Sequence, residues 1–281
     1  MFSFIPKFLG IILNFIYENL SFENYGFAII IFTIFVKLLL LPLTVKQLKS
    51  SAKMQELQPL IQEVQRKYKN DKEKLNEEMM KVYTENKYNP ASGCLPTFLQ
   101  LPILFSLIYV IGKPLTYMLN FSSEKVTQII EKTGVGKGFY NQLEAINKDP
   151  TIGLNMDFLG LDLGKIPTWV PNQLFGDEMM TYLPMLMIPL FSFVTAILSS
   201  KLMMMSTMKR NGNNKNSSGS QDSAMAMQKN MMYIAPVMTL FFAFKFPLGI
   251  ALYFLVGNIF QIFQQLYVNN VVINKKEVEE K

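Results

Sequence analysis

Residues 29–49, IIIFTIFVKLLLLPLTVKQLK, form an almost continuous apolar run that Lys37 interrupts. About 20 helical residues, each rising 1.5 Å, cross a hydrocarbon layer of about 30 Å, so this run predicts a membrane-spanning helix. A lysine at the centre of such a helix costs about 2.5 to 3.5 kcal/mol on insertion scales unless it faces protein, water or an opposite charge. The run therefore indicates an integral membrane protein, and Lys37 is a candidate functional residue.

The composition of the chain supports this class. Half of its 281 residues are apolar, and only 17% are charged. The chain has no histidine, which is the commonest metal ligand and the usual general base, and its single cysteine, Cys94, permits no internal disulfide. We therefore expect no catalytic residue, metal site or cofactor, and no enzymatic activity. The net charge of +6 favours contact with anionic lipid or ribosomal RNA over specific DNA binding.

Four further apolar runs are long enough to span a bilayer. The predicted fold is an all-α integral membrane protein with a core of five transmembrane helices, a cytoplasmic two-helix hairpin and an N-terminal interfacial helix. In chain order, the expected segments are an extracytoplasmic amphipathic helix (1–22), the first span (23–46), the hairpin (47–89), the second span (90–112), an extracytoplasmic loop (113–180), the third span (181–202), a flexible cytoplasmic loop (203–229), the fourth span (230–246), the fifth span (248–270) and a cytoplasmic tail (271–281).

The distribution of lysine and arginine predicts the orientation. Residues 46–90 hold ten basic side chains, and residues 201–229 hold five against one acid. Residues 113–180 hold six basic and eight acidic side chains. The first two segments are therefore expected in the cytoplasm and the third outside, with the N-terminus outside and the C-terminus in the cytoplasm.

Segment 47–89 has the pattern of two amphipathic helices. Its apolar residues recur at helical spacing, as Leu57, Ile61, Val64 and Tyr68 in the first arm and Leu75, Met79 and Val82 in the second. Asp71 can cap the second arm, and Pro59 is expected to kink or interrupt the first. The predicted partner-recruiting residues of this hairpin are Leu57, Pro59, Ile61, Tyr68 and Met79.

Polar side chains accompany Lys37 in the predicted spans. No aspartate or glutamate interrupts the apolar part of any span, so Lys37 is expected to face water. Polar residues lie at helical spacing on the first, second, third and fifth spans: Thr33 and Thr44; Thr97 and Gln100; Ser192, Thr195 and Ser199; Asn258, Gln261 and Gln265. They lie at mid-membrane or on its cytoplasmic side, which predicts a wet cavity open inward and sealed outward. The alternative for each is ordinary hydrogen bonding between helices.

Several motifs resemble those of a known family. VKLLLLPLTVKQ, LQPLIQEVQRKYKND, NPASGCLPTFLQLPILFSLIYVI, DFLGLDLGKIPTW and FPLGIALYFLVGNIFQIFQQ are similar, in this order, to segments of the YidC family of membrane protein insertases, with its mitochondrial Oxa and chloroplast Albino relatives. Two residues depart from the family pattern: Lys37 stands where arginine is usual, and Phe254 where tryptophan or tyrosine is common. An ammonium lacks the bidentate geometry of a guanidinium.

The resemblance implies a bacterial, Gram-positive-like insertase in the plasma membrane. It implies a hydrophilic groove, open to cytoplasm and lipid, that accepts nascent membrane proteins with or without the Sec translocon; ribosome and signal-recognition components are further possible partners. We assign the groove to Lys37, Thr33, Thr97, Gln100, Phe254, Asn258, Gln261 and Gln265. Leu104, Phe105 and Ile262, with Phe254, are expected to form an apolar slide for the substrate helix.

Two other function classes explain some of these features. A secondary transporter or channel would also need a polar midplane, but five spans give no obvious inverted repeat, and no intramembrane carboxylate is present to couple an ion. An assembly scaffold would use the hairpin without the groove.

Overall fold

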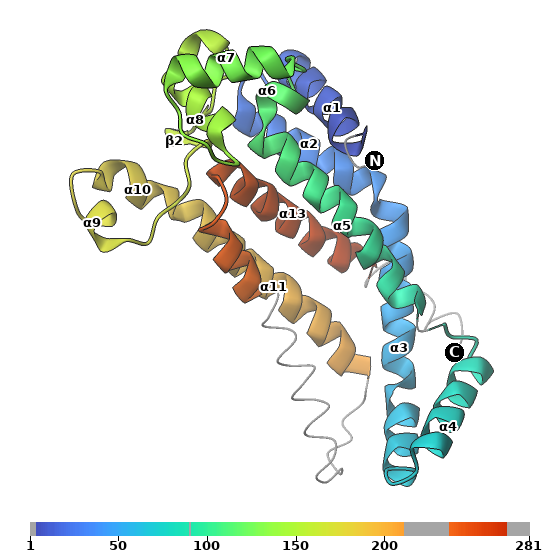
Figure 1. Cartoon of the computed structure of the whole chain (residues 1–281). Coiled ribbons are helices and arrows are strands. Elements are labelled where there is room, and N and C mark those ends of the chain that lie inside the picture. Colours follow the sequence, from blue (N-terminus) through green and yellow to red (C-terminus); the bar gives the residue numbers. More distant parts are fainter. Residues whose placement is uncertain (1–3, 90, 211–235, 269–281) are drawn as a thin grey trace. The chain divides into compact units, whose positions relative to one another are not determined.

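The computed structural model describes residues 4–89, 91–210 and 236–268, without the side chains of residues 55, 91–100 and 203–210. Within these ranges the chain is predominantly helical, as expected for an all-α membrane protein (Figure 1). It divides into two compact units, which are described separately. Unit 1 comprises residues 1–38, 100–196 and 237–260, and unit 2 comprises residues 39–99, 197–236 and 261–281.

Two described helices are long and apolar enough to cross a membrane, Met179–Leu202 and α13 (Leu248–Tyr267). The first combines α10 (Met179–Met185) with most of α11 (Met187–Arg210). A third candidate is the pair formed by α2 (Tyr25–Leu39) and residues 41–54 of α3 (Leu41–Lys67). In α5 (Ala91–Gly112), Leu101–Gly112 is a shorter apolar helix.

The predicted fourth span, 230–246, lies partly outside the described residues, although residues 236–243 are helical. By length and composition, the described residues thus contain two or three helices that could span a membrane, and the five-span core is a proposal.

Pro42 explains why the predicted first span is two helices. The break lies at Leu40, which is the N-cap of α3, and Pro42 lies in the first turn of that helix. A proline has no N–H to donate to the carbonyl four residues earlier, here that of Leu38, but it is tolerated at a helix start. α2 therefore ends at Leu39, and Lys37 lies in its last turn.

In unit 1, α13 packs against α2 and α5 at Gly249. A side chain at this position would contact Ile29 of α2 at 3.2 Å and Ile111 of α5 at 3.4 Å. The buried Tyr25 hydroxyl donates a hydrogen bond of 3.2 Å to the Ile111 carbonyl, which joins α2 to α5. The fully buried core of the unit includes Leu13, Tyr25, Ile29, Phe32, Leu107, Ile111, Leu115, Leu143, Leu163, Met185, Leu248 and Ile250.

A two-stranded antiparallel hairpin is an exception to the all-α prediction. It pairs β1 (Asp157–Phe158) with β2 (Leu161–Asp162), and its turn residues Leu159 and Gly160 both have positive φ, 55° and 80°. Such turns match the twist of a short hairpin. The loop after it caps α13, because the Lys165 carbonyl accepts from the Leu248 N–H at 2.8 Å and the Leu163 carbonyl accepts from the Gly249 N–H at 2.9 Å.

The N-terminal helix α1 (Phe4–Leu20) forms within the segment predicted to be helical, and its place at the membrane interface stays a prediction. One face is buried and includes Leu9, Leu13, Ile16 and Tyr17, and the other exposes Phe4, Phe8, Ile11 and Phe15. The buried face meets α6 (Pro114–Tyr117) at Gly10, where a Cβ atom would overlap the Tyr117 carbonyl.

The remainder of segment 113–180 is folded. It contains α7 (Ser123–Thr133), α8 (Asn141–Lys148), the 3₁₀ turn η1 (Pro150–Ile152) and α9 (Pro171–Leu174). Lys132 of α7 pairs with Asp149 at 2.9 Å. Hydrogen bonds from Thr151 and from Lys132 lower the pKa of Asp149 below its usual value.

In unit 2, α3 packs against α4 (Lys72–Glu85), and Figure 1 shows the two helices side by side. Asp71 caps α4 as predicted, since its carboxylate accepts from the Lys74 N–H at 3.1 Å. Leu57 and Ile61 are buried in this unit. α3 runs through Pro59 without interruption.

Replacing Gly10 by alanine should loosen α1 from α6, because the new methyl group overlaps a backbone carbonyl that cannot rotate away. Overpacking of this kind costs about 1 to 3 kcal/mol, against roughly 1 kcal/mol of gained helix propensity. Hydrogen exchange should therefore increase over residues 4–20. The control is Gly136→Ala, which meets no atom within 4 Å. Equal protection of α1 in both variants would contradict this packing.

Candidate substrate-contact site around Lys37

Lys37 is a half-buried cation at the C-terminal end of an otherwise apolar helix. The last carbonyl groups of a helix lack intrahelical donors, and they give this end a partial negative charge. A cation in the last turn is stabilised by that charge, typically by 0.3–1 kcal/mol. The break at Leu40 thus places the ammonium where the backbone partly offsets its desolvation.

The Lys37 side chain lies against α13 at Gly257. A Cβ atom on Gly257 would lie 3.3 Å from Lys37 Cε and 3.6 Å from Lys37 Nζ. Gly257 is buried, and the lysine occupies the space that a side chain there would take. Gly257 therefore allows the ammonium group to reach the α13 backbone.

No carboxylate pairs with this ammonium in the part of the chain that the structure describes. The ion pairs found there join Lys74 to Asp71, Lys81 to Glu77 and Glu78, and Lys132 to Asp149. A charge held in an apolar segment without a counter-ion must be solvated or meet a charge from another molecule. Lys37 can therefore attract an anionic or polar group.

Asn258, next to Gly257, joins α13 to α11. Its Nδ2 donates a hydrogen bond of 3.1 Å to the Ser192 carbonyl. The Ser192 hydroxyl is fully buried and has no hydrogen-bond partner within the described ranges. Thr195 donates to the same Ser192 carbonyl at 3.0 Å. The bond from Asn258 is interhelical, which is the alternative that the sequence left open, whereas the bond from Thr195 lies within α11.

Two other predicted groove residues in unit 1 have defined places. Thr33 is fully buried, and its hydroxyl donates a hydrogen bond of 2.6 Å to the Ile29 carbonyl, so it offers no free donor to a ligand in this arrangement. Phe254 is half-buried, with its ring centroid 5.6 Å from that of Tyr253. It lies one helical turn before Asn258.

The predicted slide residues Leu104 and Phe105 are neighbours on α5. Leu104 is half-buried, and Phe105 exposes 57% of its surface. Phe105 is therefore available to lipid or to an apolar ligand. The side chains of Thr97 and Gln100, also on α5, lie outside the described residues.

The remaining residues of the predicted groove and slide belong to unit 2. Gln261 is exposed, Ile262 is half-buried, and Gln265 is buried. Their neighbour Gln264 is also buried, and its Nε2 has no partner within the described ranges. They share α13 with Gly257 and Asn258, and helical spacing places Gln261 and Gln265 on one face of that helix.

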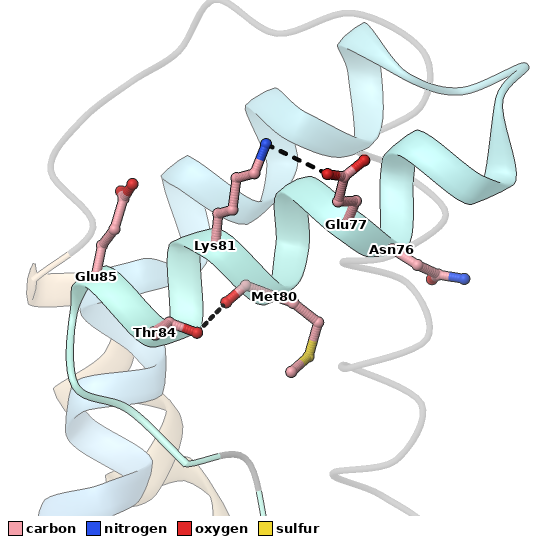
Figure 2. A pocket seen from close by; sticks show the side chains of 6 residues that line it. All are labelled: Asn76, Glu77, Met80, Lys81, Thr84 and Glu85. Atoms are coloured by element: carbon pink, nitrogen blue, oxygen red, sulfur yellow. Dashed lines mark hydrogen bonds and ion pairs between the residues drawn. The ribbon is translucent and has the colours of Figure 1, made fainter.

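The hairpin residues divide by exposure. Leu57 and Ile61 are buried within unit 2, Tyr68 and Met79 are half-buried, and Pro59 is exposed. Figure 2 shows a surface hollow on α4 lined by Asn76, Glu77, Met80, Lys81, Thr84 and Glu85. A hydrogen bond with Glu78 raises the pKa of Lys81 there. The exposed Met80, which the periodicity did not single out, is the apolar group that this surface offers.

No group of three or more histidine, cysteine, aspartate or glutamate residues suited to a metal ion occurs among the described residues. Sequence reasoning also missed Gly257. Its signal was an isolated glycine inside a helical apolar run, where glycine costs about 1 kcal/mol relative to alanine.

A double-mutant cycle tests the contact between Lys37 and Gly257. Gly257→Leu fills the space of the lysine stem, so it should lower the free energy of unfolding by about 1 to 3 kcal/mol. In a Lys37→Ala background the same change should cost much less, since the stem is gone. Melting temperatures in detergent measure both differences. An equal loss in the two backgrounds would show that the residues do not touch.

The sequence of this chain is similar to those of known membrane proteins. The chain matches the family described as "60Kd inner membrane protein" over residues 15–276. It is 34% identical to membrane protein insertase YidC 2 of Listeria innocua over 94% of this chain and 70% of the relative. It is 35% identical to membrane protein insertase YidC of Oceanobacillus iheyensis, over 90% and 78% of the two chains. It is 30% identical to membrane protein insertase YidC of Fusobacterium nucleatum, over 95% and 96%. The chain therefore belongs to the 60Kd inner membrane protein family, together with these YidC proteins.

Proposed function

We propose that this protein is a membrane protein insertase of a bacterial membrane, which acts on membrane proteins during their insertion. The observation that carries the proposal is the similarity, over nearly the whole chain, to proteins named membrane protein insertase YidC. These relatives lend no support to the alternative of a secondary transporter or channel.

Lys37 provides the polar contact in the proposed mechanism. Its ammonium lies in an apolar helix without a carboxylate partner among the described residues, and it attracts acidic or polar groups in the part of a substrate that must cross the bilayer. A polar substrate group that remains hydrated as far as Lys37 has only the rest of the hydrocarbon layer to cross. A membrane potential, positive outside, assists acidic groups by about 2.3 kcal/mol per charge per 100 mV.

The apolar part of the substrate is proposed to move along Leu104, Phe105, Phe254 and Ile262 into the lipid. The exposed ring of Phe105 and the half-buried Phe254 support this assignment. The driving force is the transfer of apolar side chains from water to hydrocarbon, at about 25 cal/mol per Å². Gln261, Gln265, Thr97 and Gln100 are proposed to keep the groove polar.

The topology proposed from charge places five spans in the membrane, the N-terminus outside, and the α3–α4 hairpin and the C-terminus in the cytoplasm. The hairpin would then face the ribosome, signal-recognition components or the Sec translocon. Because Leu57 and Ile61 are buried in unit 2, we assign any contact with these partners to the exposed part of the hairpin, including Pro59 and Met80.

Substitution of Lys37 tests the proposed mechanism. Lys37→Ala should reduce insertion of a single-span substrate with an acidic outer tail by roughly three- to tenfold, equivalent to about 0.7 to 1.4 kcal/mol. Lys37→Arg keeps the charge and should retain activity. The measurement is insertion into proteoliposomes, alongside complementation of a bacterial strain depleted of its own insertase.

A substrate with a neutral tail is the matched control, because its insertion should respond little to the loss of the charge. Equal insertion of the acidic-tailed substrate by Lys37→Ala and the unmodified protein would remove the ammonium from the mechanism. Failure of the unmodified protein to insert either substrate would instead contradict the proposed function itself.

A further inference from the structure

Segment 113–180 has a charged part and an uncharged part. Residues 123–149, which include α7 and α8, carry Glu124, Lys125, Glu131, Lys132, Lys137, Glu144, Lys148 and Asp149. Residues 166–176, IPTWVPNQLFG, carry no charged side chain. This uncharged stretch ends three residues before Met179, where a helix long and apolar enough to span the membrane begins.

The uncharged stretch is a folded turn built around α9. The Val170 carbonyl accepts from the N–H groups of Gln173 and Leu174 at 3.1 and 3.0 Å, and the Pro171 carbonyl accepts from the Phe175 N–H at 2.9 Å. Leu174 is buried, so the turn is anchored to unit 1. The backbone that carries its outer side chains is therefore held by the fold.

Three large apolar side chains around this turn are held outward. Trp169 exposes 78% of its surface, Phe175 exposes 73%, and Met180 exposes 86%. Soluble surfaces rarely gather large exposed apolar side chains without a binding role. Tryptophan in particular favours the membrane–water interface, where its ring is buried and its N–H can meet water.

We propose that Trp169, Phe175 and Met180 form a lipid-binding surface that inserts into the bilayer at the water interface beside the start of helix Met179–Leu202. Lipid is the occupant because Met180 already belongs to this apolar helix, and Trp169 is only ten residues before its start. Asp177 and Glu178, which lie between, mark the level of the headgroups. The inference requires that the helix enters the membrane, and it does not depend on insertase activity.

The unmodified protein carries its own probe, because Trp169 is the only tryptophan. The full chain is reconstituted in phosphatidylcholine–phosphatidylglycerol liposomes whose acyl chains carry a nitroxide at a shallow or a deep position. We expect the Trp169 emission to be blue-shifted. The shallow label should quench most of its intensity, the deep label should quench less, and aqueous acrylamide should quench it weakly.

A control variant places the tryptophan in the charged part. Lys137 is exposed there, so Trp169→Phe/Lys137→Trp should be quenched by acrylamide and not by the labelled lipids. A second variant, Trp169→Phe/Phe175→Trp, should repeat the lipid quenching from the other side of the turn. Trp169 emission that only acrylamide quenches would overturn the proposal, because the surface would then face water. Emission that neither quencher reaches would also overturn it, in favour of coverage by protein.

Discussion

The Lys37 ammonium, which has no carboxylate partner among the described residues, lies against the backbone of α13 at Gly257, and the proposed mechanism depends on this contact. In hydrocarbon alone such a group would cost several kcal/mol. Two features of the chain reduce this cost. Pro42 ends α2 within one turn of the lysine, so the negative end of the helix lies beside it, and Gly257 leaves space for the stem. The part of the chain that the structure describes provides no counter-ion for this charge, and in our proposal a substrate supplies one.

The rest of unit 1 fixes the two helices that make this contact. The Leu163 and Lys165 carbonyls cap α13, Gly249 lets it approach α2 and α5, and Asn258 ties it to α11. The loop that provides the cap also leads to the turn around α9. Residues 163–176 therefore cap α13 and, in our proposal, contact lipid.

Much of the helical arrangement is predictable from the sequence because apolar runs, charge and helical spacing act locally. The helix α1, the cap at Asp71 and the buried positions of Leu57 and Ile61 follow from such patterns. The family follows from motifs such as GCLPTFLQLPI, and the match over residues 15–276 confirms it.

Other features depend on tertiary contacts that no local pattern encodes. Thr33 lies on the same face as Lys37 by spacing, yet its hydroxyl bonds within its own helix. Gly257 lowers the helix propensity of α13, and only its contact with the Lys37 side chain explains why a glycine stands there. The break at Leu40 and the β1–β2 hairpin are likewise not among the elements that the sequence predicts.

Water access to position 37 tests the central claim most directly. Cys94 is the only cysteine, so a Lys37→Cys/Cys94→Ala variant carries one thiol, and Cys94→Ala alone gives the background. A membrane-impermeant thiol reagent should modify the variant in inverted vesicles, where it meets the cytoplasmic face, and should leave it unmodified in intact cells. Absence of modification from either side, in a variant that is present and folded in the membrane, would contradict a solvated site at this depth.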